Sequence, residues 1–263
     1  MQRYFVDPVQ ITEQQVVLTG DDARHLGAVM RAKPGDAFIA CDGQGRNVLA
    51  KIESIDREAI RANIVQVLPT SAEMTWRVTV AQSLPKGDKL ETVIQKGTEA
   101  GAFAFQPFLS RRTVVQYDAR KEAKRAERWR KIAKEAAEQS HRSIVPEVRS
   151  VCDWKKLLSG FSAYDLVLWC YEEEGRAGKG LRRTLAEFRK GQGGRAAGDR
   201  LPSVLLVVGP EGGFAPEEAE AAAASGAVPI GLGGRILRTE TAALYALACI
   251  AYESGELGED PSA

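Results

Sequence analysis

The sequence is poor in the residues that build metal sites and disulfide frameworks. Its 263 residues include four cysteines and two histidines, and the cysteines are scattered without CxxC spacing. Neither a zinc site nor a set of disulfides fits this pattern, so we expect no metal and a reducing compartment. No apolar run is long enough to span a bilayer, and residues 1–10 lack a signal-peptide core. These absences predict a cytoplasmic protein without a membrane partner.

Two common phosphate-binding motifs are also missing. A Walker loop ends in GK[ST], a tripeptide that does not occur in the chain. A Rossmann site has G-x-G-x-x-G after its first strand, whereas the turn after the apolar run Val204–Val208 reads GPEGGF. A nucleotide-dependent metabolic enzyme is therefore disfavoured.

The charge is small overall but unevenly distributed. Hydrophobic residues make up 44% of the chain and charged residues 27%, with a formal net charge of +1, as expected for a globular protein. Residues 111–142 nevertheless hold eleven Lys or Arg against five Asp or Glu, an excess of six. A basic segment of this kind favours a polyanionic partner.

The most informative stretch is 204–247. Two apolar runs, Val204–Val208 and Ala227–Leu232, are each typical of a buried strand. Each run leads into a glycine-rich turn, and each turn is followed by a helical pattern. Glycines after parallel strands let backbone amides approach a ligand at the carboxyl edge of a sheet. The stretch therefore predicts a small-molecule pocket.

The chain before and after residues 69–73, a polar and proline-bearing hinge, shows two different patterns. Residues 1–70 alternate like short strands around one helix, which is typical of a small barrel. Residues 75–252 alternate between strand and helix patterns, which favours a parallel α/β sheet. The expected N-terminal strands are Gln15–Thr19, Ala37–Cys41, Val48–Ile55 and Ile60–Val67, and the helix is Asp21–Met30 with Asp21 or Asp22 as its cap. The expected later elements are strands Arg77–Ala81, Phe105–Leu109 and Asp165–Tyr171, helices Leu90–Ala100 and Lys121–Ser140, and a surface loop at Gly191–Asp199.

Several motifs resemble those of one enzyme family. GPEGGF followed by LGGRILRTETA is similar to the cofactor loops of the RsmE family, SPOUT-class methyltransferases that act on N3 of a uridine in 16S ribosomal RNA. The opening RYFV and the stretch HL-x-x-V-M-R-x-x-PGD resemble the PUA-like RNA-binding domain of that family. The chain departs from the family at Gly234, where proline is usual, a change that removes no functional group.

The resemblance implies a fold and an assembly. It implies an α/β SPOUT methyltransferase domain over residues 74–254 with a C-terminal trefoil knot, preceded by a small PUA-like β-barrel RNA-binding domain over residues 1–70. Pattern reasoning alone would not predict a knot. Family members work as homodimers with the active site at the subunit interface, and their RNA substrate is 16S ribosomal RNA of the small subunit.

The resemblance also implies a reaction, methyl transfer from S-adenosylmethionine to uridine N3, and residues for it. Arg238 is expected to stabilise negative charge on a uracil oxygen, and Glu240 or Glu211 to take the proton, although helix capping explains Glu240 equally well. The identity of the general base stays open. The expected cofactor-binding residues are Leu168, Gly209, Pro210, Glu211, Gly212, Gly213, Leu232, Gly233, Ile236, Leu237 and Thr239. Leu168–Glu172 is expected to be the first of three loops around the cofactor.

For RNA binding we single out basic residues in both halves of the chain. They are Arg3, Arg31, Lys86, Arg112 and Arg142. A solubilising surface explains the lysines near residue 90 equally well. A non-catalytic RNA-binding ribosome-assembly factor with the same fold is the alternative function, but such a protein has no need for two intact glycine-rich turns.

Overall fold

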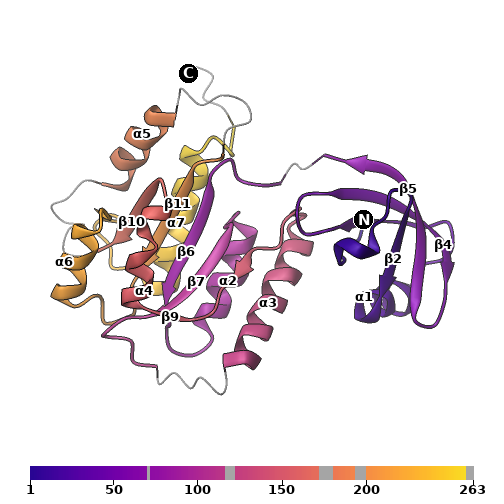
Figure 1. Cartoon of the computed structure of the whole chain (residues 1–263), viewed down its shortest axis with the longest axis horizontal. Coiled ribbons are helices and arrows are strands. Elements are labelled where there is room, and N and C mark those ends of the chain that lie inside the picture. The colour runs from indigo at the N-terminus through magenta and orange to yellow at the C-terminus, as the bar shows by residue number, and fades with distance from the viewer. Residues whose placement is uncertain (70–71, 116–121, 172–179, 193–199, 259–263) are drawn as a thin grey trace. The chain divides into compact units, whose positions relative to one another are not determined.

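The computed structural model describes residues 1–69, 72–115, 122–171, 180–192 and 200–258. The chain divides into two compact units (Figure 1). The first combines Met1–Glu73 with Lys134–Val145, and the second combines Met74–Ala133 with Pro146–Ala263. Residues 134–145 therefore cluster with the N-terminal part of the chain, although the sequence pattern placed them in the second domain.

The first unit is built on a five-stranded mixed sheet in the order β1-β3-β4-β5-β2. β1 runs parallel to β3, and the remaining pairs are antiparallel. Register shifts between β4 and β5 mark bulges, which bend and twist a sheet into a half-barrel. The strands are β1 (Arg3–Phe5), β2 (Gln15–Thr19), β3 (Ala37–Cys41), β4 (Asn47–Ile55) and β5 (Ala59–Leu68).

The core of the first unit follows the alternation of its strands. Val16, Leu18 and Phe38 are fully buried, while Gln15 and Thr19 beside them are exposed. The expected single helix is α1 (Gly20–Arg24) continued by a π-helical turn, η2 (His25–Val29). A 3-10 turn, η1 (Pro8–Gln10), links β1 to β2.

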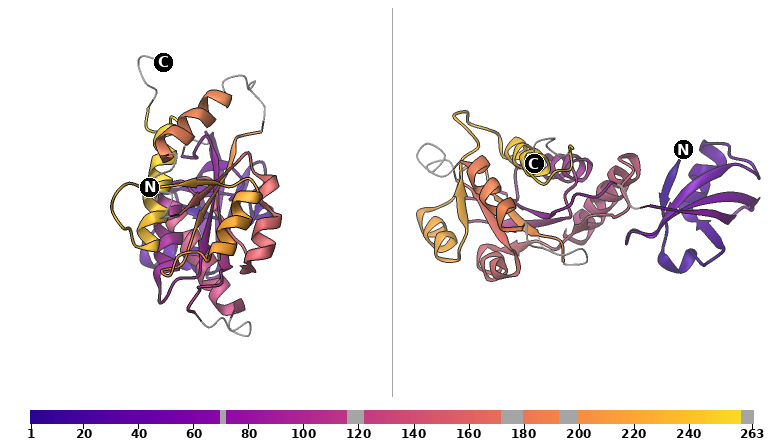
Figure 2. Two further views of the ribbon diagram at one scale, coloured as in Figure 1. Left: turned by 90° about the vertical axis from the view of Figure 1, so that its left-hand side faces the viewer. Right: turned by 90° about the horizontal axis from the view of Figure 1, so that it is seen from above.

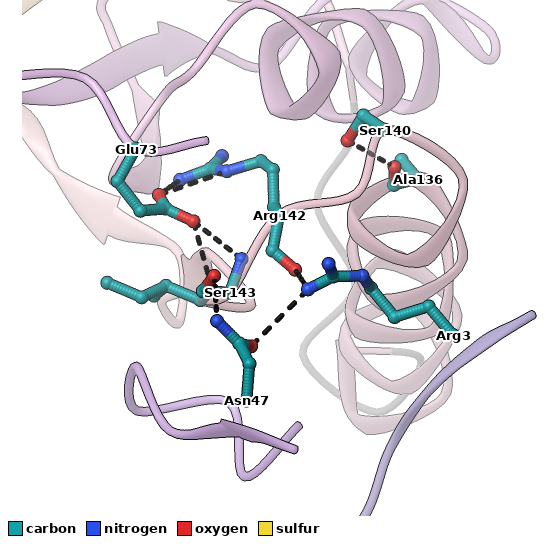
Figure 3. A network of polar contacts seen from close by, with 8 residues as sticks. Arg3, Asn47, Glu73, Ala136, Ser140, Arg142 and Ser143 are labelled. Carbon is teal, nitrogen blue, oxygen red and sulfur yellow. Dashed lines mark hydrogen bonds and ion pairs between the residues drawn. The ribbon is translucent and has the colours of Figure 1, made fainter. Parts of the chain in front are cut away.

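A polar network closes the first unit, and we call it the Arg142 network: Arg3, Asn47, Glu73, Arg142 and Ser143 (Figure 3). Nη2 of Arg142 lies 2.6 Å from a carboxylate oxygen of Glu73. The other Glu73 oxygen accepts from the Ser143 amide at 2.8 Å, and Arg3 donates to the Arg142 carbonyl at 3.0 Å. The amide of Asn47 donates to the Ser143 hydroxyl at 2.6 Å. These contacts hold residues 142–143 against the N-terminal part of the chain.

The second unit is built on a parallel sheet in the order β12-β10-β11-β6-β7-β8, with β9 also paired to β7. The central strand β11 is buried at all six positions, as expected for a parallel strand covered on both faces. The strands are β6 (Arg77–Ser83), β7 (Ala104–Leu109), β8 (Glu147–Val148), β9 (Cys152–Asp153), β10 (Leu166–Cys170), β11 (Ser203–Val208) and β12 (Val228–Ile230).

Helices cover both faces of this sheet. α7 packs on β6 and β11, whereas α4 packs on β7 and against α6, so that α6 and α7 lie on opposite sides (Figure 2). The helices are α2 (Lys89–Glu99), α3 (Glu122–Gln139), α4 (Trp154–Ser159), η4 (Phe161–Ala163), α5 (Leu181–Gln192), α6 (Pro216–Ala224) and α7 (Thr239–Glu253). The sequence pattern predicted α2, α3, α6 and α7, but not the short elements β8, β9, α4 and η4, nor α5.

The buried face of α2 is as predicted. Leu90, Val93, Ile94 and Gly97 are buried. A Cβ on Gly97 would lie 2.8 Å from the ring of Phe105, so glycine lets this helix approach β7 closely. α2 also packs against α7, and the start of α2 is thereby held at the sheet edge where the next subsection places the site.

Candidate functional site

Three adjacent strands end at one edge of the second sheet, and a cleft of about 570 Å³ lies there. The segments that follow β10, β11 and β12 supply most of its wall, because parallel strands place their carboxyl ends together. The lining residues are Lys89, Arg112, Cys170, Tyr171, Val208, Gly209, Pro210, Glu211, Gly212, Gly213, Phe214, Ile230, Gly231, Leu232, Gly233, Arg235, Ile236, Leu237, Arg238, Thr239 and Ala242.

The structure brings together ten of the eleven residues predicted to bind a cofactor. Leu168 does not line the cleft, because it is fully buried within β10. Tyr171, one position beyond that strand, lines the wall in its place. Residue 172, the end of the first predicted loop, lies outside the described residues, as do its neighbours up to 179.

The turn after β11 needs glycine for two different reasons. A Cβ on Gly209 would lie 2.8 Å from the ring of Phe214, which packs beneath the turn. Gly213 has a φ of +65°, in the region that favours glycine, and its amide donates to the Pro210 carbonyl at 3.0 Å. The turn is therefore compact and presents backbone to the cleft.

The turn after β12 presents backbone in a different way. Gly233 has a φ of +95°, and a Cβ built on it would meet no atom within 4 Å. Within the described part of the chain, the amides of Leu232, Gly233 and Gly234 take part in no hydrogen bond. Amides that have no partner in the chain and lie beside open space can donate to a polar ligand.

A buried relay joins the turn after β11 to the start of α7. The hydroxyl of Thr239 donates to the Gly209 carbonyl at 2.7 Å and accepts from the Gln82 amide nitrogen at 2.8 Å. Gln82 lies at the end of β6 and is buried. The relay fixes the start of α7 against the turn after β11, so these two parts of the cleft wall are held together.

Positive charge gathers along the cleft. Lys89, Arg112, Arg235 and Arg238 all line it, whereas Glu211 is the one carboxylate among the lining residues that the structure describes. Sequence reasoning left Lys89 as a solvent-exposed lysine on a helix. The signal that could have marked it is its place at the end of the charged sequence KGDK, residues 86–89.

Lys89 links two segments of the site. Its ammonium lies 3.0 Å from a carboxylate oxygen of Glu211 and 3.5 Å from one of Glu240. The hydrogen bond to Glu211 is the main cause that raises the pKa of Lys89, so the ammonium stays charged. The start of α2, the turn after β11 and the first turn of α7 therefore meet at one cation.

The two carboxylates predicted as proton acceptors differ in position. Burial opposes ionisation of Glu211, but hydrogen bonds from its own amide, Lys89 and the Lys86 amide outweigh burial and lower its pKa. A carboxylate with a lowered pKa is a weak base, so this geometry does not fit the prediction that Glu211 takes a proton. Glu240 lies in the first turn of α7, behind the cleft wall and 3.5 Å from the Lys89 ammonium.

Arg112 reaches the cleft from a tightly held turn. The backbone amide of Ser110 donates to the Thr113 hydroxyl at 2.9 Å. The buried carboxylate of Glu218 accepts from the amide of Arg111 at 2.8 Å. Arg112 itself donates to the Gly212 carbonyl at 3.1 Å, and its side chain is exposed. This predicted RNA-binding residue therefore borders the cleft.

The remaining predicted RNA-binding residues fall into two classes. Lys86 and Arg31 are exposed, and Arg31 has a φ of +56°, unusual for a residue other than glycine. Arg142 is buried and paired with Glu73 (Figure 3), because its guanidinium satisfies the Arg142 network. Arg3 is half-buried and donates to three acceptors in the same unit. The prediction that Arg3 and Arg142 face RNA is therefore corrected: both side chains point into the first unit.

Neither a metal site nor a membrane-spanning helix is expected from the sequence. Among the described residues, no group of three or more His, Cys, Asp or Glu is placed to hold a metal ion. In the same part of the chain, no helix combines the length and apolar character needed to cross a bilayer. Residues 193–199 of the predicted surface loop and residues 116–121 of the basic segment lie outside the described residues.

Comparison with known families also divides the chain near residue 70, although residues 134–145 fall within the match to residues 72–251. A family model described as an RNA methyltransferase domain matches residues 72–251. A second, described as an RNA methyltransferase PUA domain, matches residues 18–65. The first match alone spans more than half of the chain.

Individual relatives match over almost their whole length. Ribosomal RNA small subunit methyltransferase E of Bacillus subtilis (strain 168) is 40% identical over 268 residues, which cover 99% of this chain and 100% of the relative. The enzyme of the same name from Neisseria gonorrhoeae, solved bound to S-adenosyl methionine, superposes with a TM-score of 0.80 at 29% identity, covering 96% of this chain and 97% of that one. A putative methyltransferase from Legionella pneumophila, solved with the cofactor SAM, gives 0.79 at 28% identity and covers 98% of each chain. The chain thus belongs to the RsmE family, the ribosomal RNA small subunit methyltransferases E.

Proposed function

We propose that this protein methylates N3 of a uridine in 16S ribosomal RNA, using S-adenosylmethionine as the methyl donor. The observation that carries the proposal is the cleft at the carboxyl edge of β10, β11 and β12, with its two glycine turns. Two of the similar solved structures named above are described as bound to this cofactor. Proteins of the family carry the name of a small-subunit ribosomal RNA methyltransferase.

The residues of the cleft fit the cofactor. The amides of Leu232 and Gly233, which line the cleft and have no hydrogen-bond partner within the described part of the chain, are donors for the polar groups of the adenine and the methionine carboxylate. Leu232, Leu237 and Tyr171 provide apolar surface in the same cleft for a flat ring. When bound, the cofactor supplies an activated methyl group on a sulfonium centre, so that no metal is needed for the transfer.

The positive residues of the cleft have a separate task. Lys89 already has carboxylate partners, but Arg112, Arg235 and Arg238 also line the cleft. A sulfonium is itself a cation, so one carboxylate on the ligand does not account for these three arginines together. An RNA phosphate and a uracil anion both provide the missing negative charge. We therefore assign Arg238 and Lys89 to stabilise charge on the uracil oxygens as N3 loses its proton.

This assignment changes the role of Glu211. Its lowered pKa and its contacts with Lys89 and the Lys86 amide make it an orienting partner of the ammonium. N3 is then deprotonated because its anion is stabilised, and the proton passes to solvent. Uridine N3 lies in the Watson–Crick edge, so the base must enter the cleft unpaired.

A second copy of the chain is part of the proposal. The outward face of α7 exposes Tyr245 and Tyr252, and Ile236 beside the cleft is 78% exposed. Large apolar side chains exposed around a site are typical of an interface. We infer a homodimer, acting in the cytoplasm, and the C-terminal knot stays a prediction. Sedimentation at about twice 28.6 kDa supports the dimer, and sedimentation at the single-chain mass contradicts it.

The function is tested by mass mapping of 16S ribosomal RNA from cells with and without this protein. The expected result is one uridine that is 14 mass units heavier, about one methyl group, only when the protein is present. Calorimetry with S-adenosylmethionine separates the alternative, because a non-catalytic assembly factor has no need to bind the cofactor. Cofactor binding without any change in the RNA would overturn the assigned substrate and leave the methyltransferase assignment standing.

A further inference from the structure

A second cleft in the second unit has no part in the site described above. It encloses about 520 Å³ between the start of α2 and the first turns of α3. Leu84 and Leu90 contribute one apolar side and Trp129 the other, and all three side chains are buried. The floor of this second cleft is therefore apolar.

Basic residues of α3 form its rim. Arg128 pairs with Glu91 at 2.6 Å, so these two charges cancel. Lys124 is exposed and Arg125 is half-buried, and neither makes an ion pair or hydrogen bond within the described part of the chain. Asp88 on the opposite rim leaves the cleft with a surplus of one positive charge. Cations that have no protein partner above an apolar floor suit a ligand that is anionic at one end and flat and apolar at the other.

The two clefts share one wall. Lys89 lines the first cleft, whereas its sequence neighbours Asp88 and Leu90 line the second. Lys86 in the same segment is exposed. A single RNA strand with one base in the first cleft can therefore continue across residues 86–89, where Lys86 and Lys89 outnumber Asp88, into the second.

We propose that the second cleft binds a nucleotide adjacent to the methylated uridine on the same RNA strand, with its phosphate on Lys124 and Arg125 and its base on the apolar floor. This inference rests on the proposed function. The cleft then supplies orientation: it fixes the strand on one side of the target base and so restricts which uridine reaches the cofactor.

The first test measures binding of oligouridylate as a function of salt. Arg125→Ala should weaken binding about tenfold and reduce the slope of log K against log salt by about 0.7, the value for one phosphate contact to a single strand. Arg130→Ala is the matched control, because Arg130 is an exposed arginine on α3 that does not line the cleft. If Arg125→Ala and Arg130→Ala lose equal RNA affinity, the loss is due to the overall charge of the protein, and the proposal is overturned.

The second test locates the phosphate. Each phosphate of a short single-stranded RNA that carries one uridine at its centre is replaced in turn by a neutral methylphosphonate. The protein with its native sequence should lose affinity at one neighbouring position, and Arg125→Ala should abolish that loss while Arg130→Ala keeps it. Arg125→Lys retains the positive charge, so it should restore part of the affinity loss at that position. If the affinity loss caused by each methylphosphonate simply adds to that caused by Arg125→Ala at every position, the proposal is contradicted.

The two proposals fail in distinguishable ways. Calorimetry with S-adenosylmethionine should give the same affinity for Arg125→Ala and the native sequence, since Arg125 does not line the first cleft. If the methyl mark is absent in cells but the affinity loss at one phosphate still depends on Arg125, the proposed reaction is wrong and the RNA path stands. If the methyl mark is normal but no affinity loss depends on Arg125, only the proposal for the second cleft is wrong.

Discussion

The arginines of the first unit and those of the cofactor cleft have the same side chain in opposite situations. Arg142 is buried, and its guanidinium and backbone are engaged by Glu73 and Arg3. Arg235 and Arg238 are exposed at the cleft, where Glu211 is committed to Lys89. A guanidinium that has found a carboxylate within the chain contributes to folding, and one without such a partner is left for a ligand.

The cause of the difference lies in which acids the chain brings near. Glu73 is the last residue of the N-terminal segment of the first unit, and it accepts from Arg142 and from the amides of Ser143 and Ile144. Such a buried pair is costly to desolvate but strongly destabilising to break. The cleft instead takes its shape from backbone turns, and its arginines stay exposed. Variants of the two regions should therefore affect different observables.

The largest expected effect is on folding. Arg142→Ala removes the partner of a partly buried carboxylate, and we expect the unfolding free energy to fall by about 3–5 kcal/mol. Urea denaturation followed by circular dichroism measures this loss. The affinity for S-adenosylmethionine should stay unchanged in conditions where the variant is folded. A stable Arg142→Ala variant with weakened RNA binding would restore the original prediction that Arg142 faces RNA.

Arg238→Ala should show the reverse. Loss of one donor to developing charge typically lowers the rate about 10²–10³-fold. We expect this decrease in single-turnover methylation at saturating cofactor, while the unfolding free energy changes by less than about 0.5 kcal/mol, as for other exposed positions. A variant that loses activity only in proportion to its stability would place Arg238 with the structural arginines.

Two neighbouring glycines test the part that backbone plays in the cleft. Gly233 has a positive φ, whereas Gly234 does not, and neither lacks space for a Cβ. Gly233→Ala should weaken S-adenosylmethionine binding about tenfold because alanine is strained there. Gly234→Ala should stay within about twofold, because the φ of Gly234 is outside the left-handed region and alanine is not strained there. Equal affinities of the two variants in calorimetry would show that conformation at Gly233 does not shape the site.

The smallest expected effect concerns Glu211 and pH. The pKa of Glu211 in the folded protein is lowered, so its carboxylate stays ionised at a lower pH than an ordinary glutamate does. The contact with Lys89 is therefore lost only in acid, as the pH falls through the lowered pKa. Between about pH 6 and 9 the rate profile of Glu211→Gln should keep its shape at a rate a few-fold lower. A loss of about 10²-fold or more, or a profile that loses its acid limb, would identify Glu211 as the base.

Local pattern was sufficient for most of the fold. β2 and β3 were predicted with their observed bounds, and α2 and α3 to within one residue at each end. These elements have strong periodicity and clear turn residues. β8 and β9 are two residues long and exist because β7 offers them an edge, which no local pattern signals. β12 is shorter than its apolar run, since only Val228–Ile230 pair with β10.

Side-chain roles were harder to predict than the elements that carry them. The glycine turns were recognised because their composition is itself the signal. Leu168 was assigned to the cofactor although its strand position buries it, and Lys89 was overlooked because its partners Glu211 and Glu240 are more than a hundred residues away. Arg142 was misplaced for the same reason, since Glu73 precedes it by 69 residues.

The Arg142 network also has a consequence for the synthesis of the protein. The first unit takes Met1–Glu73 and then Lys134–Val145, with sixty residues of the second unit in between. Domains of a nascent chain usually fold in order as they leave the ribosome. Here Glu73 emerges long before Arg142, and the N-terminal half-barrel must wait, with its carboxylate unmatched, until more than half of the polypeptide has been made.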